Sequence, residues 1–385
     1  MPLLPPLRLT GGLALMDGAM RDVPITVAEG AVQEGAAPAL DVSGYLVLPG
    51  ILDLHGDGFE RHLTPRPSAP FDKRRALHSA TAELAVNGVT TAWLAQSWSW
   101  EGGFRSGEAT CALLEALSAE KAALLADVRV QIRLETHITG AFAEVERAVA
   151  QHGVDYVVFN DHLPEAVELA DHQPARFAQW AAQTKRSAEE MLAIVRAAQA
   201  QGPEVPAALD RIAAAFQGLG VRMGSHDDGT AETRGFYRGL GADVCEFPTT
   251  FAAAEAARAA GEPVLMGAPN VVRLGSQSGN IAAQSLIEAG LCDGLVSDYY
   301  YPALAQAAWH LVDAGVMDLP AAWAMISAGP ARIMGLTDRG HLEPGARADV
   351  IAVNAETRKV EMTISGGRLA HLSGGLAARA WGKVA

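Results

Sequence analysis

Six side chains of the kinds that bind divalent cations each follow an apolar stretch of the sequence. They are three histidines and three carboxylates, at His55, Asp57, Glu135, His162, His226 and Asp298. His55 and Asp57 stand two positions apart, so on a strand both point to the same side. Mixed imidazole and carboxylate ligands suit Zn²⁺ best and also accommodate Mn²⁺ or Fe²⁺. The pattern predicts a centre for one or two divalent ions, which Glu135 could bridge.

Each of these residues also has an ordinary explanation when it is taken alone. A single histidine after a strand is often a hydrogen-bonded structural residue. Asp298 could cap the next helix, and Asp57 could form a turn before Gly58. Glu135 could pair with Arg133. Six such residues at the ends of apolar runs are harder to explain together, so the metal-site interpretation is preferred.

The middle of the chain alternates strand-like and helix-like stretches, which is the pattern of a parallel sheet. Eight strands are predicted, at residues 45–54, 89–95, 128–134, 156–160, 221–224, 244–247, 264–267 and 294–297. Eight strands with helical crossovers favour an α/β fold of the (β/α)₈ TIM-barrel type, in which functional side chains gather at the carboxyl ends of the strands. A doubly wound sheet stays open as an alternative, because strand order is not visible in a sequence.

The two ends of the chain read as short β elements separated by glycine turns. Residues 1–45 and 345–385 are predicted to form one small flanking β-domain, and residues 46–344 to form the barrel. The longest insertion between strands, residues 163–215, is predicted to be a helical lid.

Composition limits the partners that we expect. The formal net charge of −14 argues against general nucleic-acid binding and against attachment to an anionic membrane, although it does not exclude a small anionic substrate. Cys111, Cys245 and Cys292 lie far apart without a paired spacing, which is typical of reduced, cytoplasmic proteins. The N-terminus does not resemble a signal peptide, and no apolar run is long enough for a membrane span.

Longer motifs resemble those of the amidohydrolase superfamily. Pro-Gly-Ile-Leu-Asp-Leu-His, ending at His55, and Pro-Gly-Ala-Arg-Ala-Asp, beginning at Pro344, are similar to motifs of the whole superfamily. Arg-His-Leu-Thr-Pro-Arg-Pro from Arg61, Ser-His-Asp-Asp from Ser225 and Gly-Ala-Pro-Asn from Gly267 resemble its phosphonate-metabolism branch. The resemblance covers residues 45–355. It implies a (β/α)₈ barrel with a flanking β-domain, the same metal ligands, and hydrolysis of α-D-ribose 1-methylphosphonate 5-triphosphate to the 5-phosphate and pyrophosphate.

Such a reaction needs an acceptor for the proton of the attacking water and positive groups around the phosphate oxygens. Asp298 is the candidate acceptor. The candidate substrate-binding residues are Arg61, His62, Arg66, Arg273, Ser276, Ser278 and Asn280. Surface ion pairs with Glu60 or Asp72 are the other explanation for Arg61 and Arg66. Asp227 and Asp228 are expected to orient His226 or a neighbouring arginine, unless they form a solvated acidic turn.

The chain departs from the branch around these ligands. Gly56 and Gly58 replace threonine and asparagine, Leu163–Ala166 replaces a polar Ser/Thr-Pro-Gly-Gln run, and Gln277 replaces a histidine. An amide or cyclic-amide hydrolase, or a deacetylase, with the same metal centre is therefore the alternative. A barrel that has lost catalysis is a third hypothesis. A homodimer is an expectation by analogy only.

Overall fold

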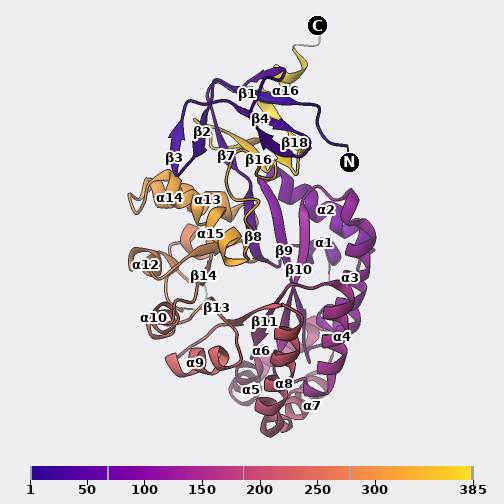
Figure 1. The fold of residues 1–385 in the computed structure, drawn as a ribbon. Helices are drawn as coiled ribbons and strands as arrows, with labels where there is room; N and C mark the ends of the chain where they lie inside the picture. The colour runs from indigo at the N-terminus through magenta and orange to yellow at the C-terminus, as the bar shows by residue number, and fades with distance from the viewer. Residues whose placement is uncertain (1, 67–68, 185, 277–278, 383–385) are drawn as a thin grey trace.

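The computed structural model describes residues 2–382 except 67–68, 185 and 277–278 (Figure 1). At its centre lies an eight-stranded parallel sheet whose strands are hydrogen-bonded in chain order from β8 to β15. The strands are β8 (Ile51–Gly56), β9 (Val89–Trp98), β10 (Asp127–Glu135), β11 (Tyr156–Asn160), β12 (Arg222–His226), β13 (Val244–Glu246), β14 (Val264–Gly267) and β15 (Gly294–Val296). The predicted (β/α)₈ architecture is confirmed, and the parallel order excludes the doubly wound alternative.

The sheet closes on itself where its first and last strands meet. Gly56 forms an isolated parallel bridge with Asp298. The Asp298 amide donates to the carbonyl of His55 at 2.9 Å, and the Asp57 amide donates to the carbonyl of Asp298 at 2.8 Å. These backbone bonds hold the end of β8 against the segment that follows β15.

A buried side-chain contact strengthens the same seam. The carboxylate of Asp53 accepts the Ser297 amide at 2.9 Å and the Ser297 hydroxyl at 2.5 Å, and both residues are fully buried. A Cβ on Gly56 would lie 2.5 Å from Asp53 Oδ2 and 2.8 Å from both Ser297 Oγ and Tyr301 Cε1. In this chain the packing at the seam therefore leaves no room for a side chain at position 56.

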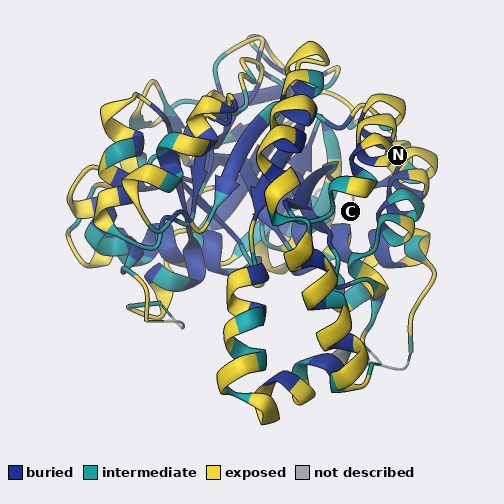
Figure 2. Cartoon of the chain, turned by 90° about the horizontal axis from the view of Figure 1, so that it is seen from below, coloured by how far each residue is buried: buried dark blue, intermediate teal, exposed yellow. Residues whose placement is uncertain are grey.

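Helices surround the strands and cover them from solvent. The strands are dark blue at the centre of Figure 2, whereas the helices around them are yellow on their outer sides. The barrel helices are α1 (Glu60–Leu63), α2 (Lys73–Val86), α3 (Gly107–Glu120), α4 (Phe142–His152), α8 (Val205–Gly218), α9 (Ala231–Gly239), α10 (Phe251–Ala259), α11 (Ala268–Val272), α12 (Ala283–Glu288), α13 (Ala303–Asp313), α14 (Leu319–Ala324) and α15 (Ala328–Ile333). Among the residues described, no helix is long and apolar enough to cross a membrane.

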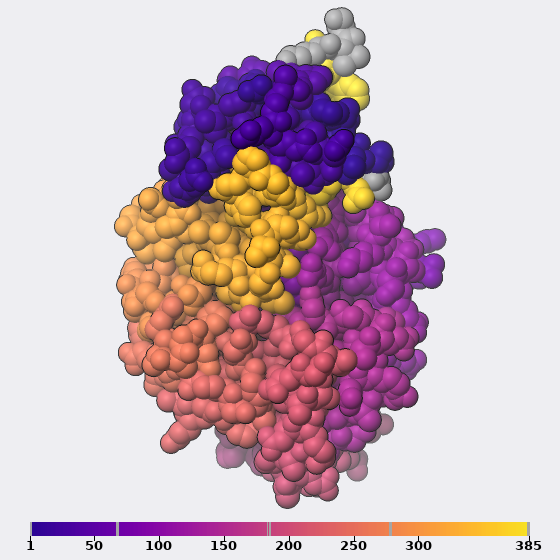
Figure 3. Space-filling view, viewed as in Figure 1, coloured from indigo at the N-terminus to yellow at the C-terminus, as the bar shows by residue number. Residues whose placement is uncertain are grey.

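Segments from both ends of the chain pack together at one end of the barrel (Figure 3). One sheet has the order β5-β4-β1-β6 and the other the order β18-β17-β16-β7-β2-β3. Their strands are β1 (Leu7–Thr10), β2 (Leu13–Met16), β3 (Ala19–Arg21), β4 (Ile25–Ala28), β5 (Ala31–Gln33), β6 (Ala39–Asp41), β7 (Tyr45–Pro49), β16 (Val350–Asn354), β17 (Val360–Ser365) and β18 (Arg368–Leu372), followed by α16 (Gly374–Trp381). The exact domain boundaries stay a prediction.

The single strand predicted at 45–54 is wrong in one respect. The segment divides at Gly50 into β7, which pairs with β16 in the terminal sheet, and β8, which begins the barrel. A Cβ at Gly50 would lie 2.3 Å from Thr90 Oγ1, so the close approach of the β9 side chain requires glycine here. The division is hard to predict from the sequence, because apolar residues stand on both sides of Gly50.

The insertion between β11 and β12 is helical, as predicted. It contains α5 (Leu163–His172), α6 (Pro174–Gln183) and α7 (Ala188–Ala200) before the barrel helix α8. These three helices bury a small core of their own, made of Leu163, Ala166, Phe177, Ala181, Met191, Val195 and Ala198. Its function as a lid stays a prediction.

We expect Gly56→Ala to lower the free energy of unfolding by about 1–3 kcal/mol, because the added methyl group must displace a packed, hydrogen-bonded carboxylate. Denaturant unfolding of the purified variant measures this change. Gly140→Ala is the matched control, since a Cβ at Gly140 meets no atom within 4 Å. Equal stability of the two variants would contradict the tight seam.

Candidate metal centre

All six predicted ligands lie at the carboxyl ends of the barrel strands. His55 is within the last residues of β8, and Asp57 follows that strand directly. Glu135 and His226 are the last residues of β10 and β12, while His162 and Asp298 come two residues after β11 and β15. The barrel thus brings to one rim residues that are distant in the sequence, although their roles as ligands stay a prediction.

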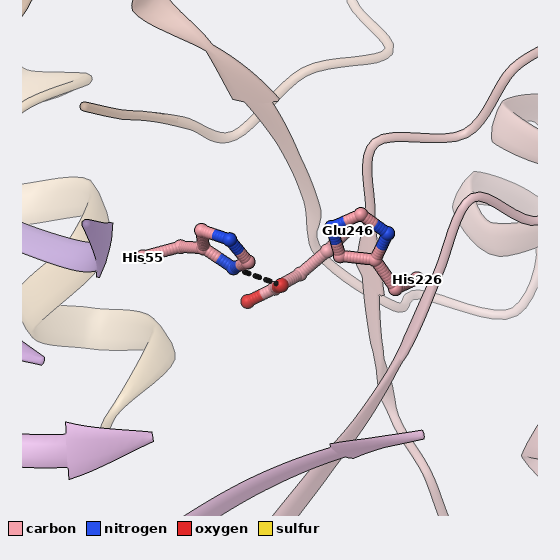
Figure 4. Close-up of side chains that lie close together, drawn as sticks. All are labelled: His55, His226 and Glu246. Atoms are coloured by element: carbon pink, nitrogen blue, oxygen red, sulfur yellow. Dashed lines mark hydrogen bonds and ion pairs between the residues drawn. The ribbon is translucent and has the colours of Figure 1, made fainter. Parts of the chain in front are cut away.

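The rings of His55 and His162 each lie close to the ring of His226 at this rim. The ring centroids of His55 and His226 are 5.3 Å apart, and those of His162 and His226 are 6.2 Å apart. Figure 4 shows His55 and His226 on either side of Glu246, whose carboxylate reaches His55. His55 is only 1% exposed.

Glu246 on β13 was not among the predicted site residues. Its Oε2 lies 2.8 Å from His55 Nδ1, and its Oε1 accepts from Gln131 Nε2 at 2.7 Å and from the Tyr156 hydroxyl at 2.6 Å. Although burial raises the pKa of Glu246, the His55 ring holds it below its usual range. Glu246 is therefore a carboxylate, and His55 donates its Nδ1–H, which leaves the Nε2 lone pair for a cation.

His162 has the same arrangement with a second carboxylate. Its Nδ1 lies 2.5 Å from Glu135 Oε1, and Glu135 Oε2 also accepts the indole N–H of Trp100 at 3.3 Å. Burial lowers the pKa of His162, but the hydrogen bond and charge of Glu135 outweigh burial and raise it. As for His55, the carboxylate fixes the tautomer that presents Nε2 to a cation.

His226 is the least satisfied of the three rings. Its Nδ1 is buried and lies 3.0 Å from Asp227 Oδ2 without the geometry of a hydrogen bond to any described residue. Its Nε2 lies 3.4 Å from an N–H of Arg133. Burial lowers the pKa of His226 to about 4 and the Arg133 charge acts in the same direction, against the opposing charge of Asp227. The ring is therefore neutral at pH 7, the state that binds metals.

These residues fit a divalent cation. Among the described residues, donor atoms of His55, His226 and Glu246 lie within 4.8 Å of one another, and so do those of His162, His226 and Asp227. Neutral imidazoles with nearby carboxylates form the donor set expected for Zn²⁺ and acceptable for Mn²⁺ or Fe²⁺. The buried His226 Nδ1 without a hydrogen bond is the atom that such an ion would satisfy.

Strand β10 supplies the site through alternate residues. Gln131, Arg133 and Glu135 are polar, whereas Ile132 and Leu134 between them are fully buried and apolar. Residues two apart share a face of a strand, and this face turns inward to Glu246, His226 and His162 respectively. This inward polar face could have been predicted from the sequence, because polar residues alternate with apolar residues along the strand.

Asp298 stands beside the histidines in a cavity of about 210 Å³ that His55, Arg133 and His226 also line. Burial, with a further contribution from the charge of Asp57, raises the pKa of Asp298 to about 6. Its backbone adopts φ 55°, a left-handed conformation that aspartate tolerates better than most residues. This turn directly after β15 is the segment whose backbone bonds to the end of β8.

Three of the predicted substrate-binding residues line the same cavity, namely Arg273, Ser276 and Asn280. Ser278 and the neighbouring Gln277 lie outside the described residues. The other predicted cations lie elsewhere.

Arg61 and His62 both contact a glutamate on helix α2. Arg61 pairs with Glu83 and donates to the carbonyl of Tyr299 at 3.0 Å, and His62 Nε2 lies 2.7 Å from Glu83 Oε2. Arg66 is exposed. The ion pair considered as the other explanation for Arg61 does form, but with Glu83 in place of Glu60 or Asp72.

The two aspartates after His226 have different surroundings. Asp227 has φ 60°, and although desolvation raises its pKa, the His226 ring outweighs this effect and lowers the pKa to about 2. Asp228 is fully buried and accepts from the Ser225 hydroxyl at 2.6 Å and from Arg234 at 3.2 Å. Asp227 thus lies against His226 and Asp228 against an arginine, while their orienting roles stay a prediction.

A second cavity of about 490 Å³ adjoins the centre on the side of the helical insertion. Trp100 and Trp180 form an aromatic wall there, with ring centroids 5.8 Å apart. Arg133 and His162 line this cavity too, so both cavities open onto the candidate metal centre.

We expect Glu246→Gln to weaken binding of Zn²⁺ about 10- to 100-fold, because the amide cannot accept from His55, Gln131 and Tyr156 together. Competition with a chromophoric chelator measures the affinity of the metal-free protein. Asp243→Asn, on a neighbouring exposed side chain that pairs with Arg222, is the control. An unchanged affinity in Glu246→Gln would remove Glu246 from the centre.

Comparisons with known proteins give the family of this chain. The family model described as the amidohydrolase family matches residues 8–371. The chain is 32% identical over 368 residues to α-D-ribose 1-methylphosphonate 5-triphosphate diphosphatase of Escherichia coli, which covers 92% of this chain and 93% of that relative.

Solved structures share the fold at low identity. Ochratoxinase of A. niger matches with a TM-score of 0.65 and 16% identity, covering 96% of each chain. Dihydropyrimidinase of Brevibacillus agri matches with a TM-score of 0.57 and 12% identity, covering 95% of each chain. The family match and the identity to the E. coli enzyme carry the assignment: this chain belongs to the amidohydrolase superfamily, in its phosphonate branch.

Proposed function

We propose that this member of a hydrolase family splits a phosphoanhydride bond of a ribosyl 5-triphosphate, α-D-ribose 1-methylphosphonate 5-triphosphate, and releases pyrophosphate. The observation that supports it most directly is the cavity beside His55 and Asp298, which places Arg133 and Arg273 with the polar side chains of Ser276 and Asn280. The 32% identical E. coli relative carries the name of this activity.

In the proposed reaction, the histidines at the rim bind the metal ion and two glutamates orient the histidine rings. A divalent ion, Zn²⁺ in this proposal, would lower the pKa of a bound water toward neutrality and so make hydroxide available at pH 7. His55, His162 and His226 would hold the ion, and Glu246 and Glu135 keep two of these rings oriented.

The remaining groups act on the proton and on the phosphate charge. Asp298 orients the attacking water and accepts its proton, then passes it to the leaving group. Arg133 and Arg273 offset negative charge on the non-bridging oxygens, for which guanidinium groups are well suited. Ser276 and Asn280 contribute a hydroxyl and an amide to the same oxygens.

Hydrolysis of a C–N bond at the same centre is the competing proposal. Its support is that Arg61 and His62 are engaged by Glu83, which leaves fewer cations for a polyanion than the sequence predicted. A substrate panel that follows pyrophosphate and amine release in parallel separates the two. Amine release without pyrophosphate release would reject the phosphoanhydride proposal.

We expect Asp298→Asn to retain bound metal while kcat falls about 10²- to 10⁴-fold, because the amide cannot accept the proton of the water. Metal analysis and steady-state kinetics on the same preparation measure both quantities. Asp318→Asn, a helix cap on the distant α14, is the control. An unchanged kcat would exclude Asp298 as the proton acceptor.

We expect Arg273→Met to raise KM for a 5-triphosphate substrate about 10- to 100-fold, since a charge-assisted hydrogen bond is lost. Hydrolysis of a neutral amide, if there is any, should change little. Arg196→Met is the matched control, because Arg196 is exposed on α7 and pairs with Asp171. A similar loss in both variants would show that Arg273 does not contact the substrate.

A further inference from the structure

The guanidinium group of Arg133 lies at the centre of the candidate metal site. Arg133 is only 9% exposed and lines both cavities that open onto the histidines. A guanidinium group stays charged at all accessible pH values. The rim of the barrel therefore holds a permanent positive charge of its own.

Two of the predicted metal ligands face this charge. Arg133 Nη1 lies 3.9 Å from Asp57 Oδ2, and Arg133 Nη2 lies 3.4 Å from His226 Nε2. The Arg133 Nε is buried without a hydrogen bond to any described residue, so no such bond through Nε holds the guanidinium group away from this position. Arg133 consequently stands in the space between a carboxylate and an imidazole where a second cation would bind.

The donor clusters around His226 support the same conclusion. The two groups of metal-binding side chains found among the described residues share His226, and neither includes Asp57. To serve two ions at once, His226 would have to use both ring nitrogens, but Nε2 faces the Arg133 N–H donor. Only one nitrogen of this ring is left for a metal.

We infer that Arg133 takes the place of a second cation, so that the centre binds one divalent ion per chain. A second ion at the Asp57 side would face the guanidinium charge at close range in a poorly hydrated site, where like charges repel strongly. This inference rests on the metal centre of the proposed function and is independent of its substrate. It also keeps a positive charge in the cavity without a second metal.

The test compares metal content in wild type, Arg133→Met and Arg133→Lys. Metal-free protein is loaded with excess Mn²⁺, unbound ion is removed, and bound ion is counted by mass spectrometry against protein concentration. Electron paramagnetic resonance distinguishes isolated Mn²⁺ from a magnetically coupled pair. We expect one isolated ion in wild type and Arg133→Lys, and a coupled pair in Arg133→Met, in which the neutral side chain frees Asp57 and His226 Nε2.

Arg273→Met is the matched control, because it removes a different cation that lines the same cavity. It should keep one ion. Two ions in wild type would overturn the inference and leave the proposed function intact, and this result does not depend on any variant folding. One ion in a folded Arg133→Met would also overturn it. No bound ion in wild type would reject the metal centre and the inference together.

Discussion

The seam between the first and last barrel strands is the contact on which the site depends. His55 and Asp298 belong to opposite ends of the barrel sequence, and the backbone bond between them at 2.9 Å exists only when the sheet has closed. Asp53 and Ser297, which are 244 residues apart, stabilise the same seam through a hydrogen bond from the Ser297 hydroxyl to the buried Asp53 carboxylate. Burial raises the pKa of Asp53, so its hydrogen bonds to Ser297 are what offset the cost of desolvating it.

The charges inside the rim are tolerated because nearly every carboxylate has a donor. Glu246 receives three hydrogen bonds, and Glu135 receives them from His162 and Trp100. A buried charge that is paired and hydrogen-bonded costs far less than an isolated one. The same bonds restrict rotation of the imidazole rings of His55 and His162, so the protein itself fixes the orientation of these rings.

Much of this arrangement could be predicted from local sequence patterns. Apolar runs located the strands, and the polar residue after each run located the rim. The role of Glu246 could not be predicted in this way. Its partners His55 and Gln131 are 191 and 115 residues away, and only the closed barrel brings them together. Closeness in sequence suggests Arg133 as a partner of Glu135, whereas in the structure Arg133 lies against His226 and Asp57.

The departures from the phosphonate branch have local structural reasons. Gly56 is required by the packed seam, and a Cβ at Gly58 would lie 3.1 Å from Arg61 Nη1 and 3.2 Å from the carbonyl of Tyr299, which Arg61 contacts. Leu163 and Ala166 are buried in the core of the helical insertion, so apolar residues there anchor α5 immediately after His162.

These substitutions therefore lie around the histidines, and of Gly56, Gly58, Leu163 and Ala166 only Gly56 belongs to a barrel strand. A rim built on strands can keep its metal-binding geometry while the loops between strand and helix vary. Because Arg133 comes from a strand and the aromatic wall of Trp100 and Trp180 comes from a loop and the insertion, the central charge is the more constrained feature. Differences in ligand preference within this fold would then arise in the second cavity before they arise at the centre.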